Sequence, residues 1–233
     1  MERAYAHEQT WGTPDEHWLE ENELADRIRM NGALAAIWTP HCARIHPVKL
    51  VQGLAETVER LGVTIYEDSA VTQAGEGLVR TAAGSVRAPA VLRCTEGFTA
   101  QFPGERRTWL PMNSSMVVTA PLTTQQWDAI GWEGREVLGD EAHAYIYAQR
   151  TADDRIAIGG RGVPYRFGSR TDDFGVTQQI TIDQLRGSLE TLFPDLQGIE
   201  LDHAWSGVLG VPRDWTATVT YADGFGYAGG YVG

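Results

Sequence analysis

The stretch ATVTYADGFGYAGGYVG, residues 217–233, bears most directly on the fold. Its glycines Gly224, Gly226 and Gly229 have the spacing Gly-x-Gly-x-x-Gly. That spacing binds dinucleotides when a strand precedes it and a helix follows it. The residues before the glycines favour a strand, but only four residues follow Gly229, too few for a helix. The glycines could be a phosphate-binding turn, an accident of a glycine-rich chain, or a turn with some other purpose.

Composition excludes several classes of function. The chain has 233 residues and a formal net charge of -12, so nucleic acid and anionic membrane surfaces would repel it on average. It contains no apolar stretch near the roughly 20 residues of a membrane span, and no secretory signal at residues 1–12. The six histidines and the two cysteines, Cys42 and Cys94, have no metal or redox spacing. We expect a cytoplasmic protein without a bound metal, nucleic-acid partner or membrane span.

Two segments have the periodicity of an amphipathic helix. In residues 46–62 Pro47 suits the first helical position, Gly62 suits the end, and the apolar stripe is Val51, Leu54, Val58 and Leu61. In residues 180–196 we expect Thr181 to be the N-cap and Pro194 to end the helix. The buried stripe of that second helix would be Ile182, Leu185, Leu189 and Leu192. A weaker, polar helix is expected over residues 13–28, with Thr13 and Glu16 as its capping box.

The strand pattern divides the chain. Residues 63–74 predict a strand, and residues 77–97 predict a hairpin followed by a buried strand, 90–94. With the helix at 46–62 these elements suggest an α/β layer with partly parallel strands. From residue 109 onward the pattern is mostly antiparallel, with a hairpin over 144–160 that turns at 152–154. The predicted fold class is α/β (α+β): a Rossmann-like layer over 1–108 and a mostly antiparallel sheet backed by a helix over 109–222.

Five stretches in a fixed order carry a family resemblance. They are IHPVKLVQGLAETVERLGVTIYEDSAV (45–71), MNSSMVVTAPL (112–122), RIAIGGRG (155–162), WSGVLGVPRDWTATV (205–219) and GFGYAGGYVG (224–233). Together they resemble the FAD-dependent oxidoreductases of the D-amino-acid oxidase family, in the branch with glycine oxidase, sarcosine oxidase and gamma-glutamylputrescine oxidoreductase. The resemblance implies that 1–108 and 223–233 belong to an FAD-binding domain and 109–222 to a substrate domain.

The resemblance also implies that the chain is a fragment. Family members open with a strand, a Gly-x-Gly-x-x-Gly turn and a helix that hold the FAD pyrophosphate, and residues 1–31 contain no such segment. Members also continue past GGYVG into a helix that meets the flavin. By resemblance, the glycines of 224–230 are the strand and turn that approach the flavin ring. Without the first central strand, we expect the strand ending at Val71 and the stripe of the helix at 46–62 to be partly uncovered.

Candidate site residues follow from the same resemblance. The residues implied to contact FAD are Val71, Thr95, Gly97, Gly229, Gly230 and Gly233. Val71 could equally be an ordinary strand valine, and Glu96 departs from the small residues usual beside Thr95. An Arg or Tyr would recognise the carboxylate of an amino acid, and the candidates are Tyr145, Tyr147, Arg161 and Arg213. The tyrosines could simply pack, and Arg213 could pair with Asp214 on the surface.

The implied reaction is the oxidation of a C–N bond by hydride transfer to flavin N5, with the catalytic residues unknown. The FAD would be noncovalent, because no cysteine lies after Cys94 to tether it. The substrate would be a small amine or amino acid, and the electron acceptor oxygen or a redox partner. The alternative is a non-catalytic module that keeps the substrate-domain fold and binds a small molecule or a protein.

Overall fold

The computed structural model describes residues 2–12, 15–142, 145–160 and 165–232. The chain forms two compact units. Unit 1 comprises residues 1–44, 114–163 and 173–206, and unit 2 comprises residues 45–113, 164–172 and 207–233. These units are defined by contacts within the chain. The division into FAD-binding and substrate domains at residues 108 and 222 is a functional one and stays a prediction.

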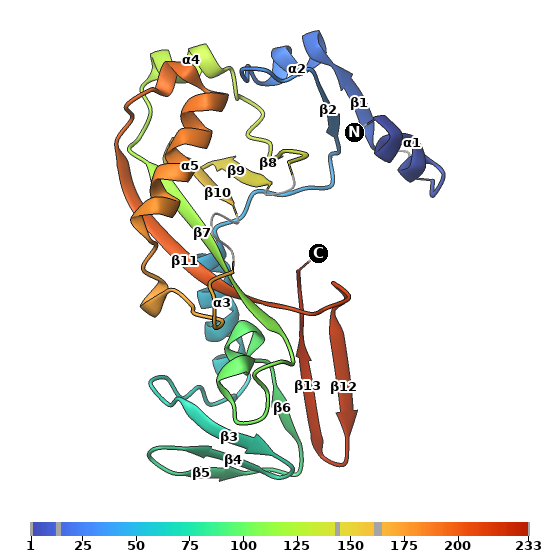
Figure 1. The fold of residues 1–233 in the computed structure, drawn as a ribbon, viewed down its shortest axis with the longest axis vertical. Helices are drawn as coiled ribbons and strands as arrows, with labels where there is room; N and C mark the ends of the chain where they lie inside the picture. Colours follow the sequence, from blue (N-terminus) through green and yellow to red (C-terminus); the bar gives the residue numbers. More distant parts are fainter. Residues whose placement is uncertain (1, 13–14, 143–144, 161–164, 233) are drawn as a thin grey trace. The chain divides into compact units, whose positions relative to one another are not determined.

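Unit 1 contains both helices and strands (Figure 1). Its helices are α1 (Glu2–Gln9), α2 (Glu21–Arg27), α4 (Thr124–Ile130) and α5 (Gln179–Leu192), with 3-10 turns η2 (Asp173–Gly175) and η3 (Pro194–Leu196). Its strands are β1 (His17–Glu20), β2 (Ala35–Trp38), β8 (Leu138–Gly139), β9 (Ile146–Arg150) and β10 (Ile156–Gly160). Two longer strands have residues in both units, β7 (Leu110–Thr119) and β11 (Leu201–Val211).

The described residues of unit 2 form one α-helix and two small sheets. Its elements are α3 (Pro47–Arg60), β3 (Val71–Gly75), β4 (Leu78–Thr81), β5 (Ser85–Arg87), β6 (Val91–Arg93), η1 (Glu96–Gln101), β12 (Thr218–Ala222) and β13 (Phe225–Gly229). One sheet has the order β12-β13-β6 and the other β3-β4-β5. Strands β13 and β6 run parallel, and β12 and β13 form an antiparallel hairpin. This mixture of a parallel pair with antiparallel strands confirms the predicted fold class.

The core of unit 1 lies between a five-stranded sheet and α5. The sheet has the order β11-β7-β10-β9-β8, and β10 pairs antiparallel with both β7 and β9. In that register Ile158 stands opposite Val117 on one side and Ala148 on the other, and all three are buried. Leu185 and Leu189 of α5 belong to the same core cluster, and Figure 1 shows α5 lying along these strands. The predicted hairpin and the predicted helix stripe are confirmed.

Helix α5 nevertheless begins earlier than expected. The carbonyl of Gln178, which has an extended backbone, accepts from the N–H groups of Thr181 and Ile182 at 3.0 and 3.1 Å. Gln178 is therefore the N-cap, and Thr181 is a buried residue inside the first turn. The prediction of Thr181 as N-cap was wrong because burial by the core, rather than side-chain capping, fixes where this helix starts.

The segment expected as a polar helix over residues 13–28 is also different. Residues His17–Glu20 form β1, which pairs antiparallel with β2, and only Glu21–Arg27 are helical. The capping box consists of Glu20 and Glu23, and Thr13 lies outside the described residues. Leu19 on the strand is buried in the core cluster. Pairing with β2 and burial of Leu19 outweigh the helical propensity of this stretch.

Strand β3 is much shorter than the strand expected over residues 63–74. Residues 63–70 contain no strand, and Val71 begins β3 instead of ending a strand. Val71 pairs with Thr81 in the antiparallel sheet β3-β4-β5. A strand needs a neighbour for its backbone hydrogen bonds, and no described strand pairs with residues 63–70.

The Gly-x-Gly-x-x-Gly stretch is not a pyrophosphate fingerprint. Gly224 has a φ of 81° in the tight turn between β12 and β13, where glycine is favoured. Gly226 and Gly229 lie within β13 itself. The strand and turn expected from the resemblance are present, and the preceding strand, β12, is confirmed.

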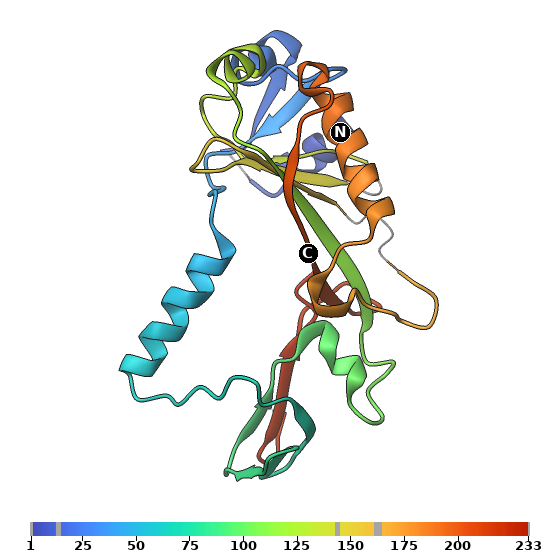
Figure 2. The same ribbon diagram turned by 90° about the vertical axis from the view of Figure 1, so that its left-hand side faces the viewer.

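Helix α3 forms as predicted but its apolar side is uncovered. His46 caps it by accepting from Lys49 N–H, Pro47 is its first residue, and none of its residues is buried. Figure 2 shows α3 running without another described helix or strand of unit 2 beside it. Across the described residues, no helix is long and apolar enough to cross a membrane.

Candidate functional site

Two glycine-containing turns follow the parallel strands of unit 2. Cys94–Gly97 follows β6, and residues 230–232 follow β13. Ligands of sheets with parallel strands bind beyond the carboxyl ends of those strands. Four of the predicted cofactor residues lie in these turns or at the strand end beside them, namely Thr95, Gly97, Gly229 and Gly230. Val71 lies in the other sheet of the unit, and Gly233 lies outside the described residues.

The carboxylate of Glu96 joins the two turns. Its Oε1 accepts from the N–H of Tyr231, at 3.1 Å, and its Oε2 accepts from the N–H of Gly210 at the end of β11, at 2.9 Å. The hydroxyl of Thr95 hydrogen-bonds to that of Thr99 at 2.8 Å and so holds the start of η1. Sequence reasoning treated Glu96 only as a departure from the family pattern. The sequence hinted at a structural role for Glu96 only through its position between two predicted cofactor residues, Thr95 and Gly97.

Close packing explains why two of these positions are glycine. A Cβ at Gly97 would lie 2.9 Å from the carbonyl oxygens of Val208 and Leu209 on β11. A Cβ at Gly229 would collide with the indole of Trp109, which is buried and also packs edge-on against Tyr227. The backbone of both turns is thus pressed against its neighbours. A side chain at Gly97 would displace the turn after β6, and a side chain at Gly229 would displace the end of β13, from which the second turn starts.

A buried arginine fixes β6 to β13 just before the turns. Arg93 is 6% exposed, and its Nη1 lies 2.7 Å from Oε1 of Glu105. Its guanidinium lies 5.4–5.9 Å from the ring centres of Phe102, Phe225 and Tyr227. The hydrogen bond from Arg93 lowers the pKa of the Glu105 carboxyl below its usual value, against an opposing effect of burial. Glu105 is therefore ionised at neutral pH and balances the charge of Arg93.

In unit 1 the two predicted tyrosines lie at β9. The Tyr147 hydroxyl shares a hydrogen bond of 2.5 Å with the hydroxyl of Ser114 on β7. Its ring covers Gly159 of β10, where a Cβ would lie 2.7 Å from the ring carbon Cζ. Tyr145, which is 37% exposed, meets Tyr147 edge-on with ring centres 6.4 Å apart. The two rings thus form one aromatic surface on the side of β9 opposite the buried Ile146 and Ala148.

The structure supports the two predicted arginines less well than the tyrosines. Arg213 is exposed in the turn after β11, and the neighbouring Asp214 accepts from the N–H of Thr216 at 3.2 Å. Arg161 lies outside the described residues. Neither arginine is therefore joined to the tyrosines by a contact that the structure describes.

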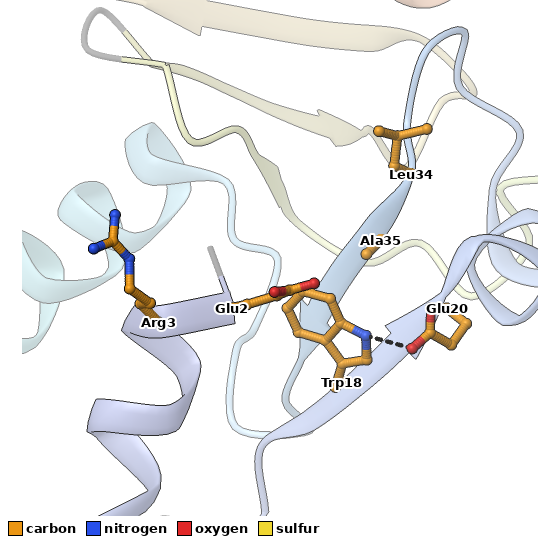
Figure 3. A pocket seen from close by; sticks show the side chains of 6 residues that line it. All are labelled: Glu2, Arg3, Trp18, Glu20, Leu34 and Ala35. Atoms are coloured by element: carbon orange, nitrogen blue, oxygen red, sulfur yellow. Dashed lines mark hydrogen bonds between the residues drawn. The ribbon is translucent and has the colours of Figure 1, made fainter.

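A shallow hollow of about 440 Å³ lies elsewhere in unit 1 (Figure 3). Its walls are Glu2, Arg3, Trp18, Glu20, Leu34 and Ala35. The indole of Trp18 donates to Glu20 at 2.9 Å across its floor. None of the predicted site residues lines this hollow. Within the described ranges there is also no cluster of three or more His, Cys, Asp or Glu side chains that could hold a metal.

Comparisons with known proteins identify the family of the chain. The family described as DAO, FAD dependent oxidoreductase, matches residues 1–233. The chain is 27% identical to gamma-glutamylputrescine oxidoreductase of Escherichia coli over 202 residues, which are 84% of this chain and 45% of that protein. It is 24% identical to the probable oxidoreductase OrdL of Rhizobium meliloti over 206 residues, which are 86% of this chain and 45% of that protein. The chain thus spans about half the length of these curated relatives.

Solved structures show the same fold. Glycine oxidase from Geobacillus kaustophilus has a TM-score of 0.79 at 20% identity, covering 99% of this chain and 61% of that one. L-proline dehydrogenase from P. horikoshii has a TM-score of 0.79 at 16% identity, covering 100% of this chain and 63% of that one.

Proposed function

Because the chain belongs to the DAO family of FAD-dependent oxidoreductases, we propose that it supplies the flavin-ring end of an enzyme that oxidises the C–N bond of an amine or amino acid. The observation that carries the proposal is the pair of turns beyond the parallel strands β6 and β13, joined by Glu96. The relatives named for gamma-glutamylputrescine, glycine and proline support an amine or amino-acid substrate.

The residues of unit 2 fit a flavin ring. Turns at the carboxyl ends of parallel strands present backbone N–H groups and little side-chain bulk, which is what a planar ring with carbonyl oxygens requires. The residues proposed to hold the ring are Thr95, Gly97, Gly229, Gly230 and Gly233, and Val71 is proposed for the adenine end. We propose that the FAD is bound noncovalently, since residues 95–233 contain no cysteine that could tether it.

The substrate end of the proposal rests on the aromatic surface of β9. A bound flavin would supply the acceptor for the hydride that leaves the carbon beside the substrate nitrogen. Tyr145 and Tyr147 would bind and orient the substrate. The hydrogen bond between the Tyr147 and Ser114 hydroxyls and the contact of the ring with Gly159 restrict how the Tyr147 ring can move. Arg161 and Arg213 are proposed to bind a substrate carboxylate. The electron acceptor would be oxygen or a redox partner, and the exposed thiols Cys42 and Cys94 suit a reducing, cytoplasmic compartment.

The test is anaerobic reduction of the bound flavin. The FAD-loaded chain is mixed with a panel of amines and amino acids, and loss of flavin absorbance is followed. At least one compound should bleach the flavin. Substitution Tyr147→Phe should slow that bleaching by about fivefold, because the ring then loses a hydrogen bond of about 1 kcal/mol that orients it. The exposed Tyr66→Phe, in unit 2, is the matched control and should leave the rate unchanged.

Two results would contradict the proposal in different ways. An FAD-loaded chain that no amine or amino acid reduces would favour the non-catalytic module, which binds a small molecule or protein without oxidising it. If the flavin bleaches equally fast in the Tyr147→Phe and Tyr66→Phe variants, the proposed reaction is supported but the proposed role of Tyr147 is contradicted.

A further inference from the structure

We propose that Glu96 is a positioning residue: its carboxylate fastens together the two turns that would face the flavin. The inference rests on the proposed function, which assigns those turns to the flavin ring. It gives a role to the residue at which this sequence departs from the expected small-residue pattern.

The contacts of Glu96 connect three segments that are distant in the chain. The side chain belongs to the turn after β6, Gly210 lies at the end of β11, and Tyr231 lies in the turn after β13. Each carboxylate oxygen accepts from one backbone N–H, at 2.9 and 3.1 Å. Hydrogen bonds from N–H groups to an ionised carboxylate are about twice as strong as neutral ones. One side chain thus ties both turns to the same strand end.

The backbone at Glu96 is held in an unfavourable conformation. Its φ is 42°, in the left-handed region, which is unfavourable for a residue with a Cβ. Such a conformation persists where the surroundings over-determine it. Here a Cβ added at Gly210 would lie 2.9 Å from the carbonyl carbon of Glu96, so the turn and β11 approach as closely as glycine permits. The strained backbone aims the carboxylate at Gly210 and Tyr231.

Glutamate is the side chain that these two donors require. Glutamine offers one acceptor oxygen, and its NH2 group would face the second N–H. Aspartate is one methylene shorter, so it can reach one donor at the observed backbone position. Alanine leaves both N–H groups without an acceptor. The hydrogen bonding of residue 96 to the Gly210 and Tyr231 N–H groups should therefore be strongest with Glu, weaker with Gln or Asp, and absent with Ala.

The position of the turn after β13 depends on the hydrogen bond between the Tyr231 N–H and the Glu96 carboxylate. Gly230 has a φ of 80°, which lets the chain leave β13 and bring the Tyr231 N–H to the carboxylate. The Tyr231 side chain is itself exposed, so the backbone contact, and not packing of that ring, places the turn. With Glu96 replaced, the turn keeps the packing of Gly230 against Pro212 but loses the hydrogen bond that holds the Tyr231 backbone in the position from which it would contact the flavin.

The first part of the test measures amide hydrogen exchange on the chain without FAD. In Glu96→Ala the Gly210 and Tyr231 amides should exchange about tenfold faster than in the wild-type chain, which corresponds to losing about 1.4 kcal/mol. The Val91 amide, bound to the Gly224 carbonyl at 2.9 Å in the same unit, should be unaffected. Asp214→Asn is the matched control, because Asp214 also accepts from a backbone N–H but ties only its own turn. Glu96→Gln, which keeps the size of the side chain, serves if the alanine variant does not fold.

The second part measures FAD affinity for the same variants, well below their melting temperatures. Glu96→Ala should weaken FAD binding about tenfold, Glu96→Gln less, and Asp214→Asn not at all. Unchanged exchange at Gly210 and Tyr231, or an equal increase at Val91, would overturn the fastening role. Faster exchange with unchanged FAD affinity would overturn the positioning role. A wild-type chain that binds no FAD would overturn the proposed function, and the exchange result, obtained without FAD, keeps that failure separate.

Discussion

Helices α3 and α5 have the same length, 14 residues, and both have an apolar stripe, yet they have opposite surroundings. Leu189 of α5 is completely buried against the five-stranded sheet. Leu54, in the corresponding stripe of α3, is 61% exposed. The period of apolar residues therefore shows that a helix has a face to cover, and does not show what covers it. In α5 the cover is β10 and its neighbours, whereas α3 has no cover among the described residues.

The largest expected effect is at Leu189. Leu189→Ala should lower the free energy of unfolding by about 3 kcal/mol, because it removes buried methyl groups and leaves a cavity between α5 and the sheet. Chemical denaturation of the purified variant measures this loss. A loss below about 1 kcal/mol would mean that α5 is not packed as described.

The same contrast between covered and exposed groups applies to charges. Glu105→Gln should cost about 2 kcal/mol of unfolding free energy, because it leaves the buried Arg93 without its counter-charge. The matched control is Asp15→Asn, which breaks the exposed pair of Asp15 with His41, at 2.8 Å, and should cost less than about 0.5 kcal/mol. If the two variants lost the same amount of unfolding free energy, the result would contradict the burial of Arg93.

The pH dependence of that pair has a definite sign. The pKa of Glu105 is lowered in the folded chain, so its contribution is complete above the ordinary glutamate pKa of about 4.3. It should be lost as the pH falls from there through the lowered value, since the unfolded chain then binds a proton that the folded chain does not. Denaturation curves at several pH values should show this loss in the wild-type chain and a smaller one in Glu105→Gln.

The smallest expected effect is at Leu54. Leu54→Ala should change the free energy of unfolding by no more than about 0.5 kcal/mol, because the side chain already faces solvent. It has the same chemistry as Leu189→Ala and is measured in the same way. A loss above about 1 kcal/mol would show that the α3 stripe is covered, and would break the comparison.

Local patterns in the sequence predicted the local structure well. The stripe and caps of α3, the hairpin of β9 and β10, and the strand before Gly224 all depend on neighbouring residues. The failures depend on distant ones: Thr181 is not the N-cap because the core buries it, and His17–Glu20 form a strand because β2 pairs with them.

The candidate site shows the same limit. Thr95, Gly97, Gly229 and Gly230 were found through the family resemblance, and the structure gathers them around two turns. The fastening by Glu96 could not be predicted, since its partners are 114 and 135 residues away along the chain. The close approach of Trp109 to Gly229 is also a long-range contact that no local pattern indicates.

The most direct test of the central claim is a titration of the purified chain with FAD, followed by flavin fluorescence and the visible spectrum. If the turns after β6 and β13 form the flavin-ring end of the site, binding should saturate and the flavin band should shift and gain vibrational structure. An unshifted spectrum and fluorescence that stays that of free FAD would contradict the claim that this chain holds the ring.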